Sequence, residues 1–546
     1  MSVLAPLRSR TPADAAGSAA GDSGATLASR LWPALPADRW LSWLVALVIT
    51  ALGAVLRWPN LGAPHAFSFD ETYYSKDAFS LLTFGYEHNY VDNANATILA
   101  SNGNPSALHN VFSNGGSFIV HPPVGKWVIA IGEHFFGVTP FGWRFSVCVL
   151  GTLAVLMTVR IARRLTRSTL LGGLAGLLLA LDGQAIVHSR TGLLDPVLMF
   201  FLLAAFGALL LDRDMIRKRL AITTLGYGDD RLALRTLGAG LGPNLGLRPW
   251  RWVAALCLGL ACGVKWSGVW FVVAFILLTL CWDISTRRLL GVQRPWSVTF
   301  VRSLPWVLLW FGLVVAVVYI GTWSGWLLTS GGYDRQWATT NPATGLAKFV
   351  PDALRSLLQY HKEILHFHEG LTTPHTYQSN PWSWLVQARP TSYYYQSPAL
   401  GQPGCNTAQC SSEVVALGNP IIWWAALLAL GHQAWRGIFR RDWRSAAVFT
   451  LFFAGWFPWL FTQYRTTFTF YSVAYLPFIV MALAMSLGSM LGPVTASPNR
   501  RAVGASMVGA VVIAAVLSAW FFYPIWTAEV IPYAQWQLRM WFPTWV

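Results

Sequence analysis

The chain has 546 residues, of which 54% are hydrophobic and only 11% are charged, and its mean hydropathy is +0.45. This balance excludes a string of soluble domains and indicates a protein that lies in a lipid bilayer. The net charge of +16 does not indicate nucleic acid, because the arginines form short runs between apolar segments, where they orient helices and contact lipid headgroups.

Residues 1–38 are rich in Ala, Gly, Ser and Pro, and we predict that they form a disordered tail. Residues 39–546 are interpreted as one membrane-embedded domain, an all-α polytopic membrane protein with about eleven membrane-spanning helices. The apolar segments cover residues 40–57, 139–160, 169–187, 192–211, 251–264, 267–282, 304–321, 419–435, 445–461, 468–489 and 503–523. Residues 124–137 are expected to form a further amphipathic or re-entrant piece.

Short basic runs separate these segments, and under the eleven-helix arrangement all of them fall on one side of the membrane. They contain Arg160, Arg163, Arg164, Arg167, Arg213, Arg217, Lys218, Arg219, Arg287, Arg288, Arg294, Arg436, Arg440, Arg441, Arg444, Arg500 and Arg501. The positive-inside rule makes that side the cytoplasm. The N-terminus is then cytoplasmic, the C-terminus is extracytoplasmic, and two long loops, residues 58–123 and 322–418, face outward. Loops of this length are usually functional.

Two adjacent carboxylates, Asp70 and Glu71, stand in the sequence SFDETYYSKDAF just after the first apolar segment. The simpler interpretation is a solvated pair in which Asp70 caps a helix that begins at Glu71. A short acidic motif does not by itself decide between this interpretation and a catalytic pair. Three further features of the sequence favour a catalytic pair.

The first feature is the sequence HPPVGKW, residues 121–127, which closes the first outer loop. Its two prolines predict a rigid turn at which His121 and Lys126 project near the membrane surface. The alternative is a proline-stiffened turn with a snorkelling lysine. We include both residues among the candidate pocket residues.

The second feature is a set of cations within or beside apolar segments, namely Arg144, Arg190 and Lys265. An ionisable group there is costly and needs a partner or a function. Arg190 precedes Asp195 by five residues, so we expect these two pocket candidates to form an ion pair. Arg144 and Lys265 have no obvious acidic neighbour, and the phosphate of a lipid-linked substrate would supply one.

The third feature is the composition of the second outer loop, which contains HKEILHFHEG, PHTYQSNPWSW and SYYYQ. Aromatic, Gln and Asn side chains at this density are typical of a groove for sugars or extended peptide, with His375, Tyr377 and Trp382 as candidate pocket residues. The histidines of this loop lack the tight spacing and the carboxylate of a metal site, and we predict no metal; they are His361, His366, His368 and His375.

Two of the six cysteines, Cys405 and Cys410, lie in a polar segment that the predicted topology places outside the cytoplasm. A disulfide can persist there, and we expect one between them. The other four lie in apolar runs, where cysteine is a small packing residue.

Taken in order along the chain, FDETYY, HPPVGKW, GWRFSV, HSRTGLLDP, GVKWSG, PHTYQSNPWSW and FTFYSVAYLPF resemble the protein O-mannosyltransferase family, in particular its actinobacterial branch. The resemblance implies a C-type glycosyltransferase fold. It also implies inverting transfer of mannose from a polyprenyl-phosphate-mannose donor to Ser or Thr hydroxyls of exported proteins, at the outer face of a bacterial plasma membrane.

The resemblance implies Asp70 as the base, Glu71 as its neighbour in substrate positioning, and Arg144 and Lys265 as ligands of the donor phosphate. The eukaryotic members insert a β-trefoil module in the second loop, and residues 322–418 show no run of short strands that would form one. The lipid-linked sugar is a substrate, so no cofactor is expected. Because Arg and Lys can neutralise an already activated phosphate linkage, a divalent metal is dispensable. The protein-export translocon is a candidate partner.

Two other functions agree with the same sequence. One is a different polyprenyl-phosphate-dependent glycosyltransferase that builds a lipid-linked or cell-wall glycan. The other is a transporter or lipid flippase, which would place polar groups near the middle of the bilayer rather than at its outer boundary, where this sequence gathers them. No Walker loop, dinucleotide-binding turn, HExxH or GxSxG motif occurs, which leaves a soluble nucleotide donor without support.

Overall fold

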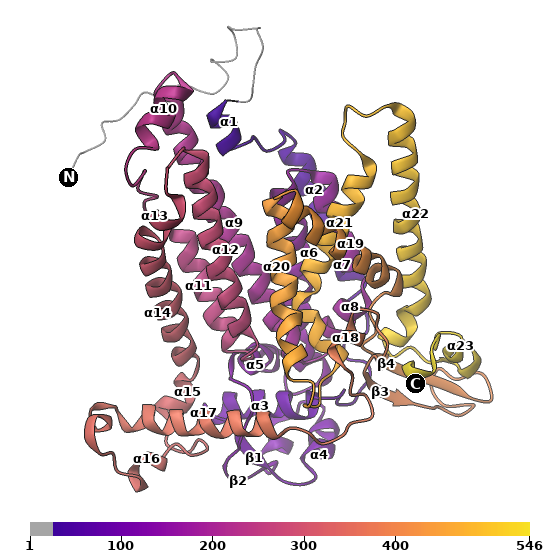
Figure 1. The fold of residues 1–546 in the computed structure, drawn as a ribbon. Coiled ribbons are helices and arrows are strands. Elements are labelled where there is room, and N and C mark those ends of the chain that lie inside the picture. The colour runs from indigo at the N-terminus through magenta and orange to yellow at the C-terminus, as the bar shows by residue number, and fades with distance from the viewer. Residues whose placement is uncertain (1–25) are drawn as a thin grey trace.

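The apolar segments of the sequence become the long helices of one bundle in the computed structural model, which describes residues 26–546 (Figure 1). Each of the eleven predicted segments contains a helix or, for residues 169–187, a bent pair of helices. They are α2 (Arg39–Val55), α6 (Pro140–Thr166), α7 (Thr169–Ala180), α8 (Gly183–Ser189), α9 (Asp195–Leu225), α11 (Pro249–Cys262), α12 (Gly268–Leu289), α14 (Leu304–Thr322), α19 (Pro420–Phe439), α20 (Trp443–Trp456), α21 (Leu476–Leu491) and α22 (Pro498–Phe522).

Polar caps and prolines explain where many of these helices begin. The side chains of Thr139, Asn419 and Asp442 accept hydrogen bonds from the free backbone N–H groups of α6, α19 and α20. Proline opens α6 and α19 at Pro140 and Pro420, a position where its missing N–H has no cost. These signals lie in the sequence next to the apolar runs, which is why the predicted and observed helix starts agree closely.

Only some of these helices are long and apolar enough to cross a membrane by themselves. Among residues 26–546, six helices are long and apolar enough to cross a membrane, or seven if α7 and α8 count as one span bent by 64°. Shorter helices such as α2 and α11 fall below that length. The chain is a multi-pass membrane protein, and the count of eleven spans stays a prediction.

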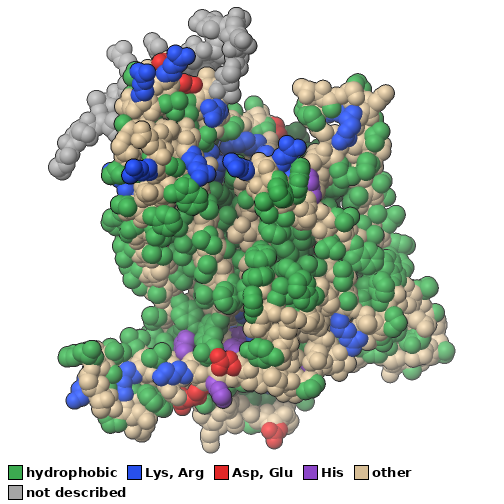
Figure 2. Space-filling model, viewed as in Figure 1, with side chains coloured by type: hydrophobic (Ala, Val, Ile, Leu, Met, Phe, Trp, Pro, Cys, Tyr) green, Lys and Arg blue, Asp and Glu red, His purple; other side chains and the backbone are tan. Residues whose placement is uncertain are grey.

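The two ends of the bundle differ, and we call them the loop end and the basic end (Figures 1 and 2). The basic end carries the predicted Arg and Lys runs and three short helices, α1 (Leu27–Leu31), α10 (Asp230–Leu237) and α13 (Pro295–Arg302). The loop end carries the two long loops, which fold into α3 (Glu71–Phe84), β1 (His88–Tyr90), α4 (Ala94–Ser101), β2 (Phe112–Gly116), α15 (Ser324–Leu328), α16 (Trp337–Thr340), α17 (Asp352–Gly370), α18 (Pro381–Trp384), β3 (Ser392–Gln396) and β4 (Cys410–Val415).

Two small sheets and one amphipathic helix hold the loop end together. Strands β1 and β2 pair antiparallel, and β3, β4 and β5 (Ile531–Pro532) form a second antiparallel sheet that joins the loop to the C-terminal segment with α23 (Tyr533–Gln537). The predicted amphipathic piece is α5 (Val124–Phe136), packed against α3 and α6. A disulfide joins Cys405 and Cys410, the expected pair.

One prediction about the N-terminal region is wrong in part. Residues 1–25 lie outside the described part of the chain, but residues 27–31 form α1 rather than a disordered tail. The side chains of Leu27 and Leu31 are buried against α9, and the backbone N–H of Leu27 donates to Asp230. Two buried leucines on one turn are too weak a pattern to stand out within an Ala/Gly-rich stretch.

Candidate active site

The backbone just before α3 fixes the position of Asp70. Phe69 has a φ of 53°, a left-handed conformation that costs a bulky residue about 1–3 kcal/mol and is found mostly where the surroundings enforce it. Here the N–H of Phe69 donates to the carbonyl of Tyr393 in β3 at 3.0 Å, and the two rings stack with centroids 5.0 Å apart. Asp70 occupies the N-cap position, but its side chain makes no capping hydrogen bond and is left available for another function.

Glu71 is fully buried in the protein, next to Asp70 in the sequence. Its two carboxylate oxygens accept hydrogen bonds from Nε and Nη2 of Arg144 in α6, both at 2.7 Å, and both side chains are fully buried. The backbone N–H groups of Ser68 and Gly192 complete its hydrogen bonding at 2.8 and 2.7 Å. The prediction that Arg144 lacks an acidic neighbour is therefore wrong, because α3 brings Glu71 against α6 from far along the chain.

Lys265 also has a partner that the sequence did not reveal. Its Nζ lies 2.7 Å from Oδ2 of Asp195, the first residue of α9. The expected pair of Arg190 with Asp195 is wrong. Arg190 instead donates to the carbonyls of the turn after α2, at Arg57, Pro59 and Asn60, because the end of α8 turns it away from α9.

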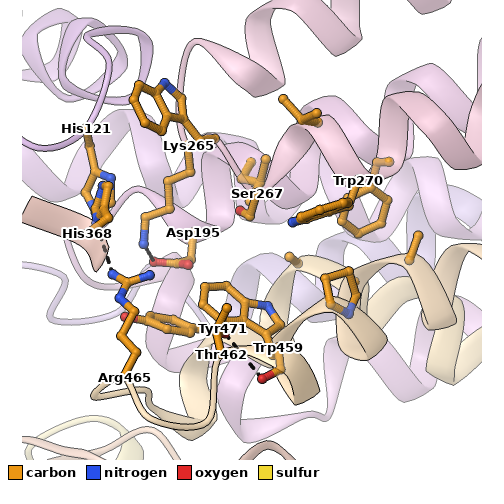
Figure 3. Close-up of a pocket in the computed structure, with 18 residues that line it drawn as sticks. His121, Asp195, Lys265, Ser267, Trp270, His368, Trp459, Thr462, Arg465 and Tyr471 are labelled. Atoms are coloured by element: carbon orange, nitrogen blue, oxygen red, sulfur yellow. Dashed lines mark hydrogen bonds and ion pairs between the residues drawn. The ribbon is translucent and has the colours of Figure 1, made fainter. Parts of the chain in front are cut away.

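A cavity of about 260 Å³ opens at the loop end between the α11–α12 turn, the start of α9 and the segment between α20 and α21 (Figure 3). Lys265 and Arg465 converge on the same part of it, beside Asp195 (Figure 3). Its polar and aromatic lining consists of His121, Asp195, Lys265, Trp266, Ser267, Trp270, Phe271, His368, Trp459, Thr462, Arg465 and Tyr471. The cavity thus combines positive charge with aromatic faces, which suits a phosphate joined to a sugar.

Asp70 does not line this cavity itself, but it is linked to the cavity wall through Tyr74 and His121. Burial raises the pKa of the Asp70 carboxyl to about 6, the positive charge of Lys265 lowers it, and the negative charge of Asp195 raises it. The hydroxyl of Tyr74 donates to Oδ2 of Asp70 at 3.4 Å, and the Tyr74 ring packs 6.3 Å from that of His121, which lines the cavity. A carboxylate with a pKa near 6 is a suitable proton acceptor at neutral pH.

Two neutral histidines border the cavity next to Arg465. His368 in α17 must donate from Nε2 to the carbonyl of Val120 at 2.9 Å, and it must accept at Nδ1 from Arg465 at 3.1 Å, which together define one neutral tautomer. Burial lowers the pKa of His368 to about 4, and burial together with the charge of Lys265 lowers the pKa of His121. Arg465 has no ion pair within residues 26–546, since it lies 3.1 Å from a neutral ring and over Trp459.

The remaining predicted pocket residues lie elsewhere. Lys126 is buried in α5, where it bridges Asp77 and Glu87 at 3.1 and 2.9 Å, so the snorkelling alternative is wrong as well. The other three lie on the second loop and do not line the cavity; they are His375, Tyr377 and Trp382. The ring of His375 does contact Phe69, next to Asp70, with centroids 6.1 Å apart.

Sequence reasoning missed Arg465 as a site residue. A signal for it exists, because Arg465 lies between the apolar segments 445–461 and 468–489 on the side that the positive-inside rule keeps poor in arginine. An arginine that breaks this pattern is a candidate for binding an anion. Trp459 and Tyr471 flank the same turn; Tyr471 lies in the motif FTFYSVAYLPF but was not selected from it, and Trp459 had no signal beyond its aromatic character.

The helix bundle and the cation-lined cavity at its loop end define a membrane-embedded glycosyltransferase. The structure shares its fold with the Saccharomyces cerevisiae protein O-mannosyltransferase Pmt1-Pmt2 complex bound to the sugar donor, with a TM-score of 0.69 over 95% of this chain and 94% of that chain at 14% identity. The family model of dolichyl-phosphate-mannose-protein mannosyltransferase matches residues 47–219. A second family model, the C-terminal four TMM region of protein-O-mannosyltransferase, matches residues 353–545.

The chain belongs to the protein O-mannosyltransferase family. It is 38% identical over 519 residues to a polyprenol-phosphate-mannose–protein mannosyltransferase of Mycobacterium tuberculosis, an alignment that covers 93% of each chain. A protein of the same name from Mycolicibacterium smegmatis is 37% identical over 518 residues, covering 93% of this chain and 94% of that one.

Proposed function

We propose that this enzyme transfers mannose from polyprenyl-phosphate-mannose to Ser or Thr hydroxyls of exported proteins, with inversion at the anomeric carbon. The observation that carries the proposal is a cavity whose wall presents Lys265 and Arg465, with Asp70 held next to that wall by its contact with Tyr74, which packs on His121. Such an arrangement separates a proton acceptor from the positive charge that a departing phosphate needs. The mannosyltransferase relatives of the chain support the choice of donor and acceptor.

In the proposed reaction the acceptor oxygen attacks the anomeric carbon while Asp70 takes the hydroxyl proton. The bond between that carbon and the phosphate oxygen breaks on the opposite face, and the electron pair leaves with the polyprenyl phosphate. Proton removal by a positioned base contributes about 10²–10⁴-fold to such reactions. Lys265 and Arg465 stabilise the charge that develops on the phosphate, and in a site poor in water preplaced cations act strongly.

Glu71 and Arg144 act through position rather than by contact with substrate. Their buried ion pair links the start of α3 to α6 and to the backbone of Gly192, three residues before Asp195. This assigns Arg144 a different role from the phosphate ligand that the sequence predicted. Arg465 takes that place in the proposal, since it lines the cavity and has no carboxylate partner within residues 26–546.

The proposed setting follows from charge. The basic end carries the Arg runs, so the N-terminus is cytoplasmic, the C-terminus is extracytoplasmic, and the cavity opens at the outer face of the plasma membrane. With two cations facing the phosphate, the reaction needs no divalent metal, and activity should survive EDTA. A contact with the export translocon stays a prediction.

The test is transfer of radiolabelled mannose from polyprenyl-phosphate-mannose to a Ser/Thr-containing peptide by the purified enzyme in proteoliposomes, with a lipid-linked glycan offered as competing acceptor. We expect Arg465→Gln and Lys265→Gln to raise the KM for the donor more than that for the peptide. Lys362→Gln, on the exposed face of α17, is the matched control and should change neither. Preferred transfer to the glycan, or equal loss toward both substrates, would contradict the proposal.

A further inference from the structure

The basic end holds a hollow of about 570 Å³, at the opposite end of α20 from the cavity of the proposed active site. Three helix corners form it: the α6–α7 turn, the α19–α20 turn and the C-terminal end of α21. Its lining consists of Thr166, Leu171, Arg436, Asp442, Arg444, Met485, Gly488, Ser489, Gly492 and Pro493. No residue of this hollow takes part in the proposed reaction.

Positive charge exceeds negative charge in this hollow. Arg436 Nη2 lies 2.8 Å from one oxygen of Asp442, and Arg444 Nε lies 3.0 Å from the other, so one carboxylate serves two guanidinium groups. Asp442 also caps α20 through the backbone N–H of Arg444, which further occupies its oxygens. The buried Nε of Arg436 has no hydrogen-bond partner within residues 26–546.

More guanidinium groups surround the rim. Arg167 directly follows Thr166 and shares the single carboxylate of Asp214 with Arg164, at 3.6 and 2.7 Å. On the far side of the hollow lies Arg500, whose guanidinium carbon Cζ is 3.9 Å from the position that a Cβ on Gly492 would occupy. A monovalent anion in the hollow would therefore find unneutralised charge on several sides.

The hollow has both charged and apolar walls, and this favours a lipid over a soluble anion as its ligand. Its charged groups lie at the helix ends, whereas Leu171 and Met485 line it one turn further into the bundle. A site for inorganic phosphate has no need of such an apolar wall, but a phospholipid places its phosphate and its acyl chains in this order. Basic pockets between membrane helices are a general means of holding acidic lipid headgroups.

We propose that this hollow binds the phosphate headgroup of an anionic phospholipid between Arg436 and Arg444, with the upper acyl chain along Leu171 and Met485. Bound lipid would tie α19, α20 and α21 together at the basic end. Gly455 lies in α20 and Pro458 lies just after the end of this helix, and both residues line the active-site cavity. The same lipid therefore stabilises one wall of that cavity from a distance. The proposal does not depend on the reaction assigned above.

Titration of the detergent-solubilised full chain with phosphatidylglycerol, followed by native mass spectrometry and by the Tm, tests the proposal. We expect saturable binding and a higher Tm with phosphatidylglycerol but not with phosphatidylcholine. One arginine near a lipid headgroup contributes about 1 kcal/mol, so Arg444→Gln should weaken binding about fivefold, and Arg444→Lys should recover most of it. Arg235→Gln, at an exposed position of α10, is the control for net charge and should bind as the unaltered protein does.

Three results would overturn the proposal. Equal loss of binding in Arg444→Gln and Arg235→Gln would show that only the total charge matters. Displacement of phosphatidylglycerol by inorganic phosphate at similar concentration would show a site for a free anion. Unchanged binding in Arg436→Gln, which serves as the second variant should Arg444→Gln fail to fold, would place the lipid elsewhere.

Discussion

The raised pKa of Asp70 makes the pH dependence of the enzyme the sharpest test of its proposed role. A base must be ionised to accept a proton, and with a pKa of about 6 the Asp70 carboxyl is about 90% ionised at pH 7 but only about 10% ionised at pH 5. We therefore expect kcat/KM for the peptide to fall about tenfold between these pH values. A carboxyl with the ordinary value of 3.8 would lose less than about a tenth of its activity over the same range.

The substitution Asp70→Asn gives the same reasoning a second measurable consequence. Burial raises the pKa of Asp70 on folding, so the ionised form is disfavoured in the folded state. This loss of stability is absent below about pH 4, grows between about pH 4 and pH 6, and is fully present above about pH 6. It amounts to at most about 3 kcal/mol at pH 7, at 1.36 kcal/mol per pH unit. Asp70→Asn should thus lower kcat at least about 100-fold while raising the Tm.

The assay is mannosyl transfer at saturating donor from pH 5 to pH 8, combined with thermal unfolding at pH 7.5. Asp92→Asn, an exposed carboxylate of the same loop, is the matched control and should keep both activity and Tm. Two results would refute the assignment of the base. One is a pH–activity profile whose acid limb stays flat down to pH 5, and the other is an Asp70→Asn variant with activity within tenfold of the unaltered enzyme. Loss of activity together with a lowered Tm would point to misfolding instead of a missing base.

Three other substitutions test the surroundings of the site. Tyr74→Phe removes a hydrogen bond that lowers the pKa of Asp70, so the acid limb of the pH profile should move to higher pH; an unmoved limb would mean that the 3.4 Å contact has no effect in solution. Glu71→Gln leaves the buried Arg144 without its counter-charge and should lower the free energy of unfolding by about 3–5 kcal/mol, seen as a large drop in Tm, whereas an unchanged Tm would contradict the buried ion pair. Cys405→Ser opens a short disulfide-closed loop and should cost about 2 kcal/mol, with no further loss when reductant is added to the variant.

The sequence allowed prediction of the helices because their signals are local. Apolar runs, caps such as Asn419 and prolines such as Pro420 all lie within a few residues of the feature that they determine. The resemblance to a family also singled out Asp70 and Lys265 as candidates, since short motifs carry those residues. What could not be predicted was the partner of each charge. Glu71 and Arg144 are 73 residues apart, and their pairing depends on which faces of α3 and α6 meet.

The same limit explains the exchange of Arg144 for Arg465 as the second cation of the cavity. Both arginines stand near the outer ends of apolar segments, so composition and spacing treat them alike. Tertiary packing separates them, because α3 supplies Glu71 to Arg144 while α17 presents only the neutral His368 to Arg465. A prediction of charge pairing therefore requires the helix contacts and cannot precede them.

The two cations of the proposed active site differ in their partners, because Lys265 is paired with Asp195 and Arg465 contacts a neutral histidine. The charge balance of the site explains why this difference is useful. Before the donor binds, Asp70 and Asp195 balance Lys265 and Arg465, so the site has no net formal charge at neutral pH. A phosphodiester adds one negative charge. Arg465, which has no ion pair in the described part of the chain, can bind it at once, whereas Lys265 is already shared with Asp195 at 2.7 Å. In the proposed reaction, the phosphate gains a second negative charge when the sugar leaves, while Asp70 loses its own by taking the hydroxyl proton. The total charge at the site thus stays constant through the step, and Lys265 needs only to turn from Asp195 toward the phosphate, so the developing charge meets a cation without any ion entering from water.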